Sequence, residues 1–399
     1  MQGATAQGPP VTTPLPVFDC IVFSGGGAKA AFGAGAAKAL TEYRRIKRID
    51  TSLCLLGASA GALTAATLAT SGADKTLEFW REASNRAILG VRLKNTKFQV
   101  TKRWVSGKYF RSPFSVYGTA ALEKFLESRL DFDGLKGKHL ILAVTDYTDA
   151  KLKAFYHSDL VDAFVREDQR SPVDEQRLQH FHPLTRENFG SVLRASSAIP
   201  VIFPPVRIED NLYVDGGLGN NTPTREAAYF LRNLKDLGTG GAGEVYVISL
   251  EPPRKRRDSD ADREGLLGIV ERALSIYHHV HTAPILGAWH RINDEVVRYE
   301  NRLEKTKAAI RESPGDPATL ETVIEKVEAG MGHLGGTTPR LNVPLHVIEP
   351  STELGETLSF DRKSIDGNIR AGYQEALQCL RHAGKVTEGE YRQLLDLPL

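Results

Sequence analysis

Cysteine, methionine and tryptophan are scarce in this chain, whose 399 residues include 3 Cys, 2 Met and 3 Trp. Three cysteines are too few for a fold held together by disulfides. Cys20, Cys54 and Cys379 are therefore predicted to be buried free thiols, with a Cys20–Cys54 bridge as the open alternative. A surplus of one charge is also missing, because 51 Lys and Arg stand against 49 Asp and Glu. This balance predicts no nucleic-acid partner.

Long hydrophobic runs are equally rare. Residues 1–16 are polar, contain four prolines and lack an apolar stretch, so they predict a disordered tail and no signal peptide. Residues 53–73 carry no charge, but their many Gly, Ser and Thr residues suit a buried strand and a small-residue helix better than a transmembrane span. The expected location is therefore the cytoplasm or the surface of a membrane.

Short apolar runs alternate with helical patterns along the chain. Strands are predicted at residues 19–24, 53–56, 139–145, 212–214, 245–250 and 345–348. Helices are predicted at residues 28–43, 60–70, 119–129, 224–233, 292–310 and 361–382. Several strands are apolar throughout, which is typical of strands covered on both faces. The sequence thus predicts an α/β fold with a mainly parallel central sheet and helices on both faces, in three layers.

No internal repeat or strong linker divides the chain. We expect one catalytic domain over residues 17–383, with a helical elaboration around residues 284–335 and a C-terminal helix or tail at residues 384–399. The charged, proline-led residues 252–264 are expected to form an exposed loop. In a parallel sheet, ligand sites lie beyond the carboxyl ends of the strands, so the loops after the predicted strands are the places to look.

The first such loop is rich in glycine. Gly25, Gly26 and Gly27, followed by Ala28 and Lys29, connect a predicted strand to a predicted helix. Consecutive glycines leave backbone amides unobstructed, and amides at the start of a helix favour an anion. That anion could be a phosphate or the oxyanion of an acyl-transfer reaction. The spacing of Gly25, Gly27 and Ala30 also satisfies a loose dinucleotide-binding pattern, with Glu42 or Asp50 as its acid.

The second loop contains a serine in the pattern G-x-S-x-G. Gly57, Ser59 and Gly61 follow a predicted strand and precede an alanine-rich helix. A sharp turn in this setting exposes the serine hydroxyl at the end of the strand, as a nucleophile requires. A serine needs a base, but none of the 11 histidines follows a strand in a compact loop with small neighbours. His278, His279 and His281 match no zinc signature and predict a helix face or a surface patch.

An aspartate is the alternative base. Asp215 ends a predicted strand and is followed by Gly216 and Gly217. Such an aspartate is often only a turn residue. However, residues 195–205, which precede it, are uncharged and rich in small residues and proline, and they predict a buried wall beside a site.

Together these three motifs resemble the patatin-like phospholipase family. Residues 25–29 are similar to its glycine-rich oxyanion motif, residues 57–61 to its nucleophile elbow, and residues 215–217 to its aspartate–glycine–glycine motif. The resemblance spans roughly residues 18–373. One position departs from the family pattern, because Ala30 stands where a glycine usually follows the basic residue. Alanine is the mildest replacement, so the loop is expected to survive.

The resemblance implies a lipid acyl hydrolase with a Ser59–Asp215 dyad and no histidine. Amides of residues 25–29 would stabilise the oxyanion, and neither a metal nor another cofactor is required. The implied substrates are phospholipids, lysophospholipids or related acyl esters. Residues 92–117 mix basic and aromatic side chains and suggest either contact with an anionic lipid surface or an ordinary exposed loop. The sequence makes no prediction of the oligomeric state.

Other functions remain open at this level. A catalytically silent binding or scaffold protein would keep the same motifs. A dinucleotide-dependent oxidoreductase would explain the glycine loop, but it would leave Ser59 and Asp215 without a role. A hydrolase of neutral lipids or thioesters would use the same dyad on another substrate.

Overall fold

Nine strands form a single sheet in the computed structural model, which describes residues 15–90, 115–160, 180–252, 266–331 and 342–399. The sheet order is β5-β4-β3-β2-β1-β8-β9, with β7 paired to β3 and β6 paired to β7. The strands are β1 (Val17–Phe23), β2 (Ser52–Ala58), β3 (His139–Asp146), β4 (Lys151–His157), β5 (Phe181–Pro183), β6 (Val206–Ile208), β7 (Asn211–Val214), β8 (Gly241–Ile248) and β9 (Leu345–Ile348).

The centre of the sheet is parallel and its margin is mixed. Strand β1 pairs in parallel with β2 and β8, and β2–β3 and β8–β9 are also parallel. Strand β3 pairs antiparallel with both β4 and β7. The predicted fold class is therefore confirmed, and each of the six predicted strands lies in this sheet. The prediction missed β4, which begins with alternating lysines, and the three-residue strands β5 and β6, which are too short to show a pattern.

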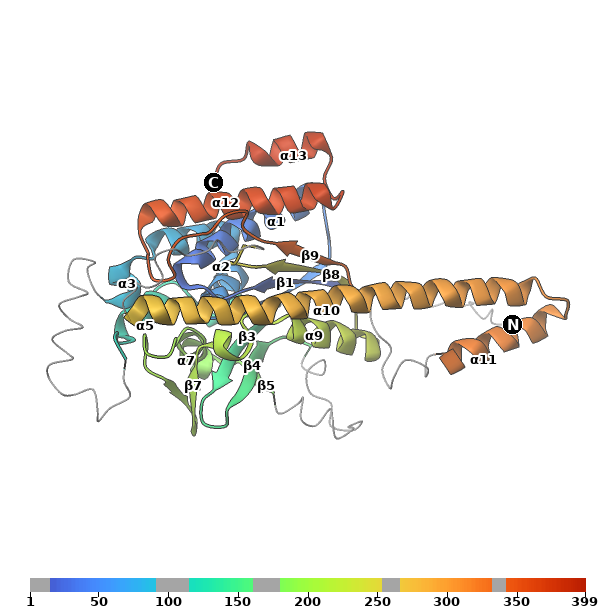
Figure 1. Cartoon of the computed structure of the whole chain (residues 1–399), viewed down its shortest axis with the longest axis horizontal. Helices are drawn as coiled ribbons and strands as arrows, with labels where there is room; N and C mark the ends of the chain where they lie inside the picture. Colours follow the sequence, from blue (N-terminus) through green and yellow to red (C-terminus); the bar gives the residue numbers. More distant parts are fainter. Residues whose placement is uncertain (1–14, 91–114, 161–179, 253–265, 332–341) are drawn as a thin grey trace, which may run out of the picture.

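Helices cover both faces of the sheet (Figure 1). They are η1 (Gly27–Ala30), α1 (Ala31–Lys47), α2 (Ala60–Glu82), α3 (Asn85–Leu89), α5 (Ala120–Glu127), η4 (Phe132–Leu135), α7 (Arg186–Ser196), α8 (Gly216–Asn220), α9 (Thr224–Asp236), α10 (Leu266–Arg311), α11 (Pro317–Met331), α12 (Arg362–His382) and α13 (Glu388–Leu395). Helices α1, α2 and α12 pack together on one side, and α9 packs against β8 on the other.

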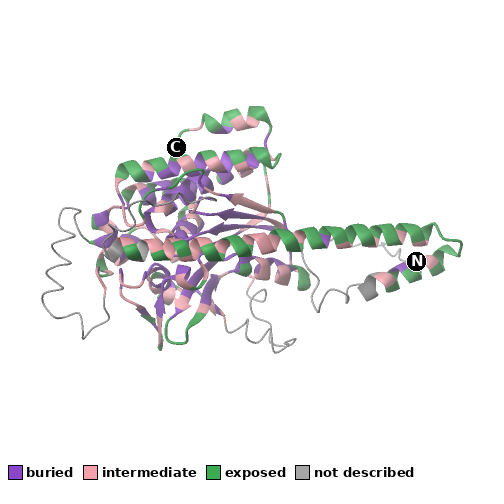
Figure 2. Ribbon diagram, in the orientation of Figure 1, coloured by how far each residue is buried: buried purple, intermediate pink, exposed green. Residues whose placement is uncertain are grey.

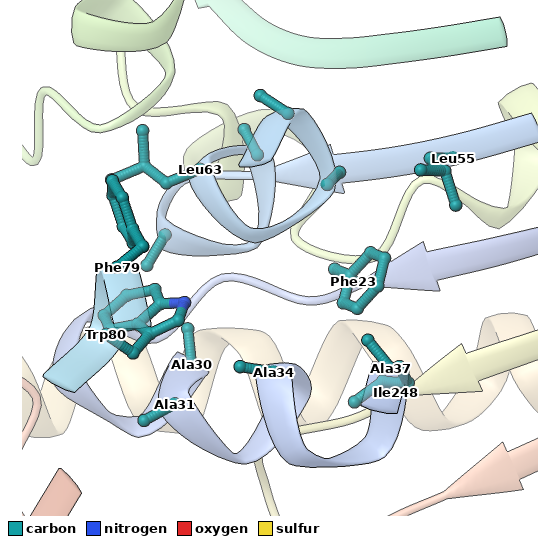
Figure 3. Close-up of a cluster of buried hydrophobic side chains, with 14 of the residues drawn as sticks. Phe23, Ala30, Ala31, Ala34, Ala37, Leu55, Leu63, Phe79, Trp80 and Ile248 are labelled. Carbon is teal, nitrogen blue, oxygen red and sulfur yellow. The ribbon is translucent and has the colours of Figure 1, made fainter. Parts of the chain in front are cut away.

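The core explains why the central strands are apolar throughout. Ile21 and Phe23 of β1 belong to the core cluster under α1 and α2, whereas Cys20 and Val22 belong to the cluster under α9. Figure 3 shows Phe23, Leu55 and Ile248 of three strands on the side of the sheet where the alanines of α1 lie. Burial of such apolar surface contributes roughly 25 cal/mol per Å² to stability. Figure 2 shows the buried residues concentrated in this central region.

The cysteines are free thiols, as predicted, but Cys379 is only partly buried, contrary to the prediction. Cys20 and Cys54 are register partners on β1 and β2, and both are fully buried. Burial raises the pKa of the Cys20 thiol. The alternative bridge between them is not formed.

Helix α10 is longer than the sequence pattern indicates. The helix predicted at residues 292–310 is the second half of α10, which begins at Leu266 and contains Pro284 in its interior. Proline normally interrupts a helix, because it lacks an amide hydrogen and crowds the preceding turn. Among the described residues, neither α10 nor any other helix is long and apolar enough to span a bilayer.

Candidate active site

Ser59 lies in the sharp turn between β2 and α2. Its backbone has φ 53° and ψ −130°, a combination that a non-glycine residue adopts only under strain. The turn is tight, because a Cβ atom on Gly61 would lie 2.3 Å from the carbonyl oxygen of Phe23. Only glycine fits there. A sharp turn with glycine on either side of the serine thus lies at the carboxyl end of β2, and Ser59 itself is buried.

Asp215 lies at the end of β7 and caps the short helix α8. The Ser59 hydroxyl donates a hydrogen bond to Asp215 Oδ2 over 2.6 Å. The amide of Gly217 donates to Asp215 Oδ1 over 2.7 Å. Thr145 at the end of β3 donates to the Asp215 backbone oxygen over 2.8 Å. Two side chains 156 positions apart are therefore in direct contact, and both carboxylate oxygens accept a hydrogen bond.

Burial controls the charge of Asp215. Loss of water around the carboxyl group raises its pKa to about 7, while the hydrogen bonds from Ser59 and Gly217 act in the opposite direction. The usual value is about 3.9. A carboxyl group with a pKa near neutrality exchanges a proton readily at physiological pH, which is what a general base must do.

The glycine loop follows β1 and lies beside Ser59. The Gly25 amide faces Asn221 and donates to its side-chain oxygen over 3.1 Å. The Ala28 amide donates to the Thr357 carbonyl over 2.7 Å. Within the described part of the chain, the amides of Gly26 and Gly27 have no acceptor. These two N–H groups are consequently able to bind an anion at the start of η1.

Gly27 also permits a close approach of the chain. Its φ is +58°, and a Cβ atom there would lie 2.1 Å from the Thr357 carbonyl oxygen. The fourth and fifth residues of the predicted motif have other contacts. The Lys29 ammonium is 3.6 Å from a carboxylate oxygen of Glu251, and the Ala28 amide is already bonded.

Two buried side chains that the sequence analysis did not single out support these loops. The Ser59 amide donates to the Ser196 hydroxyl over 3.0 Å, and Ser196 donates to the Ala143 carbonyl over 2.7 Å. Asn221 donates to the Gly25 carbonyl over 3.3 Å. Ser196 lies in the predicted buried wall, and Asn221 follows Asp215 by six positions. Their neighbourhood was visible in the sequence, but their partners were not.

A pocket opens over Ser59 and Asp215. The glycine loop forms one side of it, and residues from the predicted wall form another. The remaining side comes from α10, through Leu274, Ser275 and His278. The sequence analysis assigned none of these three residues to the site, because nothing in the local pattern of α10 places it above residues more than 50 positions earlier.

The rim of this pocket under α10 is polar. Ser275 donates to Glu251 over 3.1 Å, and Glu251 pairs with Lys29. Tyr277, two positions further along α10, donates to the Leu218 carbonyl over 2.8 Å. These contacts hold the first half of α10 against the end of the sheet where Ser59 lies.

A second pocket meets the first at Ser59 and is almost entirely apolar. It also shares Gly27, Ile199 and Leu358 with the first pocket. Its other walls come mainly from α2, α3 and α5, through Leu63, Phe79, Trp80, Ile88, Leu89 and Leu122. Such an apolar lining is suited to bind a hydrocarbon chain.

Other predicted features lie elsewhere. The basic and aromatic residues at 92–111 and the charged loop at 253–264 fall outside the described residues, whereas Tyr117 is described and buried. Glu42, the candidate acid of a dinucleotide site, pairs with Lys38 and Arg45 on α1. Among the described residues, no three His, Cys, Asp or Glu side chains are grouped so that they could hold a metal ion.

Comparison with known proteins gives one informative match. Residues 21–228 match the family model described as patatin-like phospholipase. No curated protein matches the chain. Among solved structures, the crystal structure of VipD from Legionella pneumophila is similar at 16% sequence identity, over 92% of this chain and 67% of that chain, with a TM-score of 0.36.

Proposed function

The chain belongs to the patatin-like phospholipase family of lipid acyl hydrolases, and we propose that it cleaves the carboxylic ester bonds of phospholipids or lysophospholipids with Ser59 as nucleophile and Asp215 as base. The observation that carries this proposal is the 2.6 Å hydrogen bond from the Ser59 hydroxyl to Asp215. A nucleophile and its base must be within this reach for proton transfer.

In the first step, Asp215 takes the hydroxyl proton while Ser59 Oγ attacks the ester carbonyl. The carbonyl oxygen becomes an oxyanion, for which the amides of Gly26 and Gly27 are the available donors. The intermediate collapses to an acyl-enzyme, and the departing alcohol receives the proton from Asp215. In the second step, Asp215 takes a proton from water, the water oxygen attacks the acyl-enzyme, and the fatty acid leaves as Ser59 regains its proton.

The two pockets suggest how a lipid is oriented. We assign the acyl chain to the apolar pocket between α2, α3 and α5, because burial of each methylene is worth about 0.8 kcal/mol there. The glycerol and head group then extend toward Glu251, Lys29 and Ser275 beneath α10. Both pockets reach Ser59. A lipid ester needs this arrangement, because its ester bond joins an apolar acyl chain to a polar glycerol and head group.

Active-site labelling combined with lipid hydrolysis tests this function. A fluorophosphonate should add to Ser59 of the native protein and not to Ser59→Ala. Native protein should release free fatty acid from mixed phosphatidylcholine and lysophosphatidylcholine vesicles. Asp215→Asn should lower that rate by roughly 10²–10⁴-fold, the range for loss of a general base, with an unchanged circular dichroism spectrum.

The same experiment separates the alternatives. If native protein gains no adduct and releases no fatty acid, the chain is a silent binding or scaffold member of the family. If Ser59 is labelled but only triacylglycerol or thioester substrates are cleaved, the dyad stands and the phospholipid assignment is wrong.

A further inference from the structure

The outer side of α10 carries an exposed apolar stripe. Ile269, Ile276 and Val280 are 54%, 48% and 57% exposed. With 3.6 residues per turn, they lie on one side of the helix together with the exposed Ala273 and Ala283. We call these five residues the α10 stripe. In the described residues, six of the eleven exposed large hydrophobic side chains belong to α10, so the feature is not a uniform property of the surface.

The stripe coincides with a change in composition along the helix. Between residues 266 and 290, Glu271 and Arg272 are the only acidic, Lys or Arg residues. From residue 291 to 311, nearly every second residue is charged. The stripe therefore ends where the charged half begins. In Figure 1, the first half of α10 crosses the domain and the second half extends beyond it, and Figure 2 shows exposed residues along its outer side.

The opposite side of the same turns forms the pocket. Leu274, Ser275 and His278 line the space above Ser59 and Asp215, while Ile276 and Val280 alternate with them along the chain. Tyr277 fixes this part of the helix through its bond to the Leu218 carbonyl. The stripe thus lies on the side of α10 that faces away from the pocket, within one helix diameter, roughly 10 Å, of the groups that line it.

We propose that the first half of α10 is the lipid-contact surface of the enzyme, and that the α10 stripe enters a bilayer while the opposite side of the helix admits the lipid ester to Ser59. This inference rests on the proposed function. A helix segment with few charges and with aliphatic side chains on one side is suited to the boundary between head groups and acyl chains. A lipid substrate has to leave such a boundary to reach the pocket, and this helix borders both.

A second copy of the chain fits the stripe less well. Helix pairs of this spacing rely on charged residues beside the apolar seam to select and orient the partner. The flanking positions here include Tyr277, which is bonded to the domain, and Leu286, which packs in the core under α9. Arg272 is the one charged flanking residue described. A lipid surface requires no such complement.

Vesicle flotation with full-length protein tests the proposal. Vesicles of phosphatidylcholine and phosphatidylglycerol at 7:3 should bind the native protein and Ser59→Ala equally. The double variant Ile276→Asp, Val280→Asp should lower the bound fraction at least tenfold, and its hydrolysis of a water-soluble butyrate ester should stay within twofold of native. Val297→Asp is the matched control, because Val297 is 41% exposed on the charged half of α10 and should bind like native.

The outcomes decide between the ideas. Undiminished binding by the double variant overturns the lipid-contact surface. So does a native dimer, seen by sedimentation, that the same substitutions dissociate. Vesicle binding without ester hydrolysis would refute the proposed function but not the lipid-contact surface. Hydrolysis of soluble esters without vesicle binding would refute the lipid-contact surface but not the proposed function.

Discussion

In the role proposed for it, the carboxyl group of Asp215 has to be buried enough to be a useful base and stabilised enough to ionise. Its two oxygens accept one hydrogen bond each, from Ser59 and from the Gly217 amide, which limits the rise in its pKa to about 7. The Ser59 backbone, strained at φ 53°, is held by the hydrogen bond that its N–H group donates to the Ser196 hydroxyl. At the scale of single residues, burial and a few short contacts thus bring the pKa of this carboxyl group close to neutrality.

The pKa of Asp215 predicts the pH dependence of catalysis. Only the ionised carboxylate accepts the Ser59 proton, so kcat/KM for a soluble butyrate ester should rise about tenfold per pH unit below pH 7 and level off above it. Stopped-flow or colorimetric rates between pH 5 and 9 measure this. A profile that is flat across that range would contradict the role of Asp215.

The free energy of unfolding should fall with rising pH, whereas the activity should rise. The folded pKa of about 7 lies above the unfolded value of about 3.9, so the folded state holds more protons in that interval and loses stability as the pH rises through it. Asp215→Asn removes this effect. Its Tm should therefore exceed that of native protein at pH 8 and match it at pH 4, as thermal unfolding would show.

At the scale of elements, α2 connects Ser59 to the apolar pocket. The helix begins at Ser59, and Leu63, Phe79 and Trp80 along it line that pocket. Trp80 is fixed by a hydrogen bond to Thr64 over 3.1 Å. The short helix α3 closes the far side with Ile88 and Leu89. The length of acyl chain that fits is accordingly a property of how α2 and α3 pack.

Filling this pocket should shorten the preferred acyl chain. Ile88→Trp places extra volume in the apolar pocket, so hydrolysis of palmitoyl esters should fall at least about tenfold relative to butyrate esters. Rates over a series of p-nitrophenyl esters measure the ratio. The same replacement at Val323, which is 40% exposed on α11, is the control. An unchanged chain-length preference in Ile88→Trp would place the acyl chain elsewhere.

At the scale of the whole molecule, α10 serves two regions. Its first half lies over the pocket at Ser59, and its second half extends beyond the sheet and its helices, where α11 packs back on it (Figure 1). The chain returns to the sheet next to the point at which α10 leaves it. Asn293 donates to the Val343 carbonyl over 2.5 Å and accepts from the Val343 amide over 3.3 Å.

This closeness predicts that the projecting hairpin can be removed. Replacing residues 296–340 by a short Gly/Ser linker should keep the Asn293–Val343 contact, because the two ends already touch. Butyrate ester hydrolysis should stay within twofold of native, and the Tm should be unchanged. Loss of soluble protein, or a large drop in either measurement, would show that the hairpin belongs to the folding unit.

Some features were predictable because they depend on residues that are adjacent in the sequence. The elbow around Ser59, the glycine loop and the apolar strands β1 and β2 each have a local pattern, and the family resemblance that they suggested is confirmed. The strands β5 and β6 were missed because three residues carry no period. The contribution of α10 to the pocket was missed, because helical periodicity indicates which side of a helix is apolar but not which other elements that side packs against.

The sequence by itself determined the sharp turn at Ser59 and the glycine loop after β1, since both depend on backbone conformations that adjacent glycines permit. Only the tertiary structure decided that Asp215 reaches Ser59, that Ser196 and Asn221 hold the loops, and that α10 lines the pocket. Distance and burial arise from how the strands are ordered and how helices pack on them, and these depend on contacts between residues far apart in the chain.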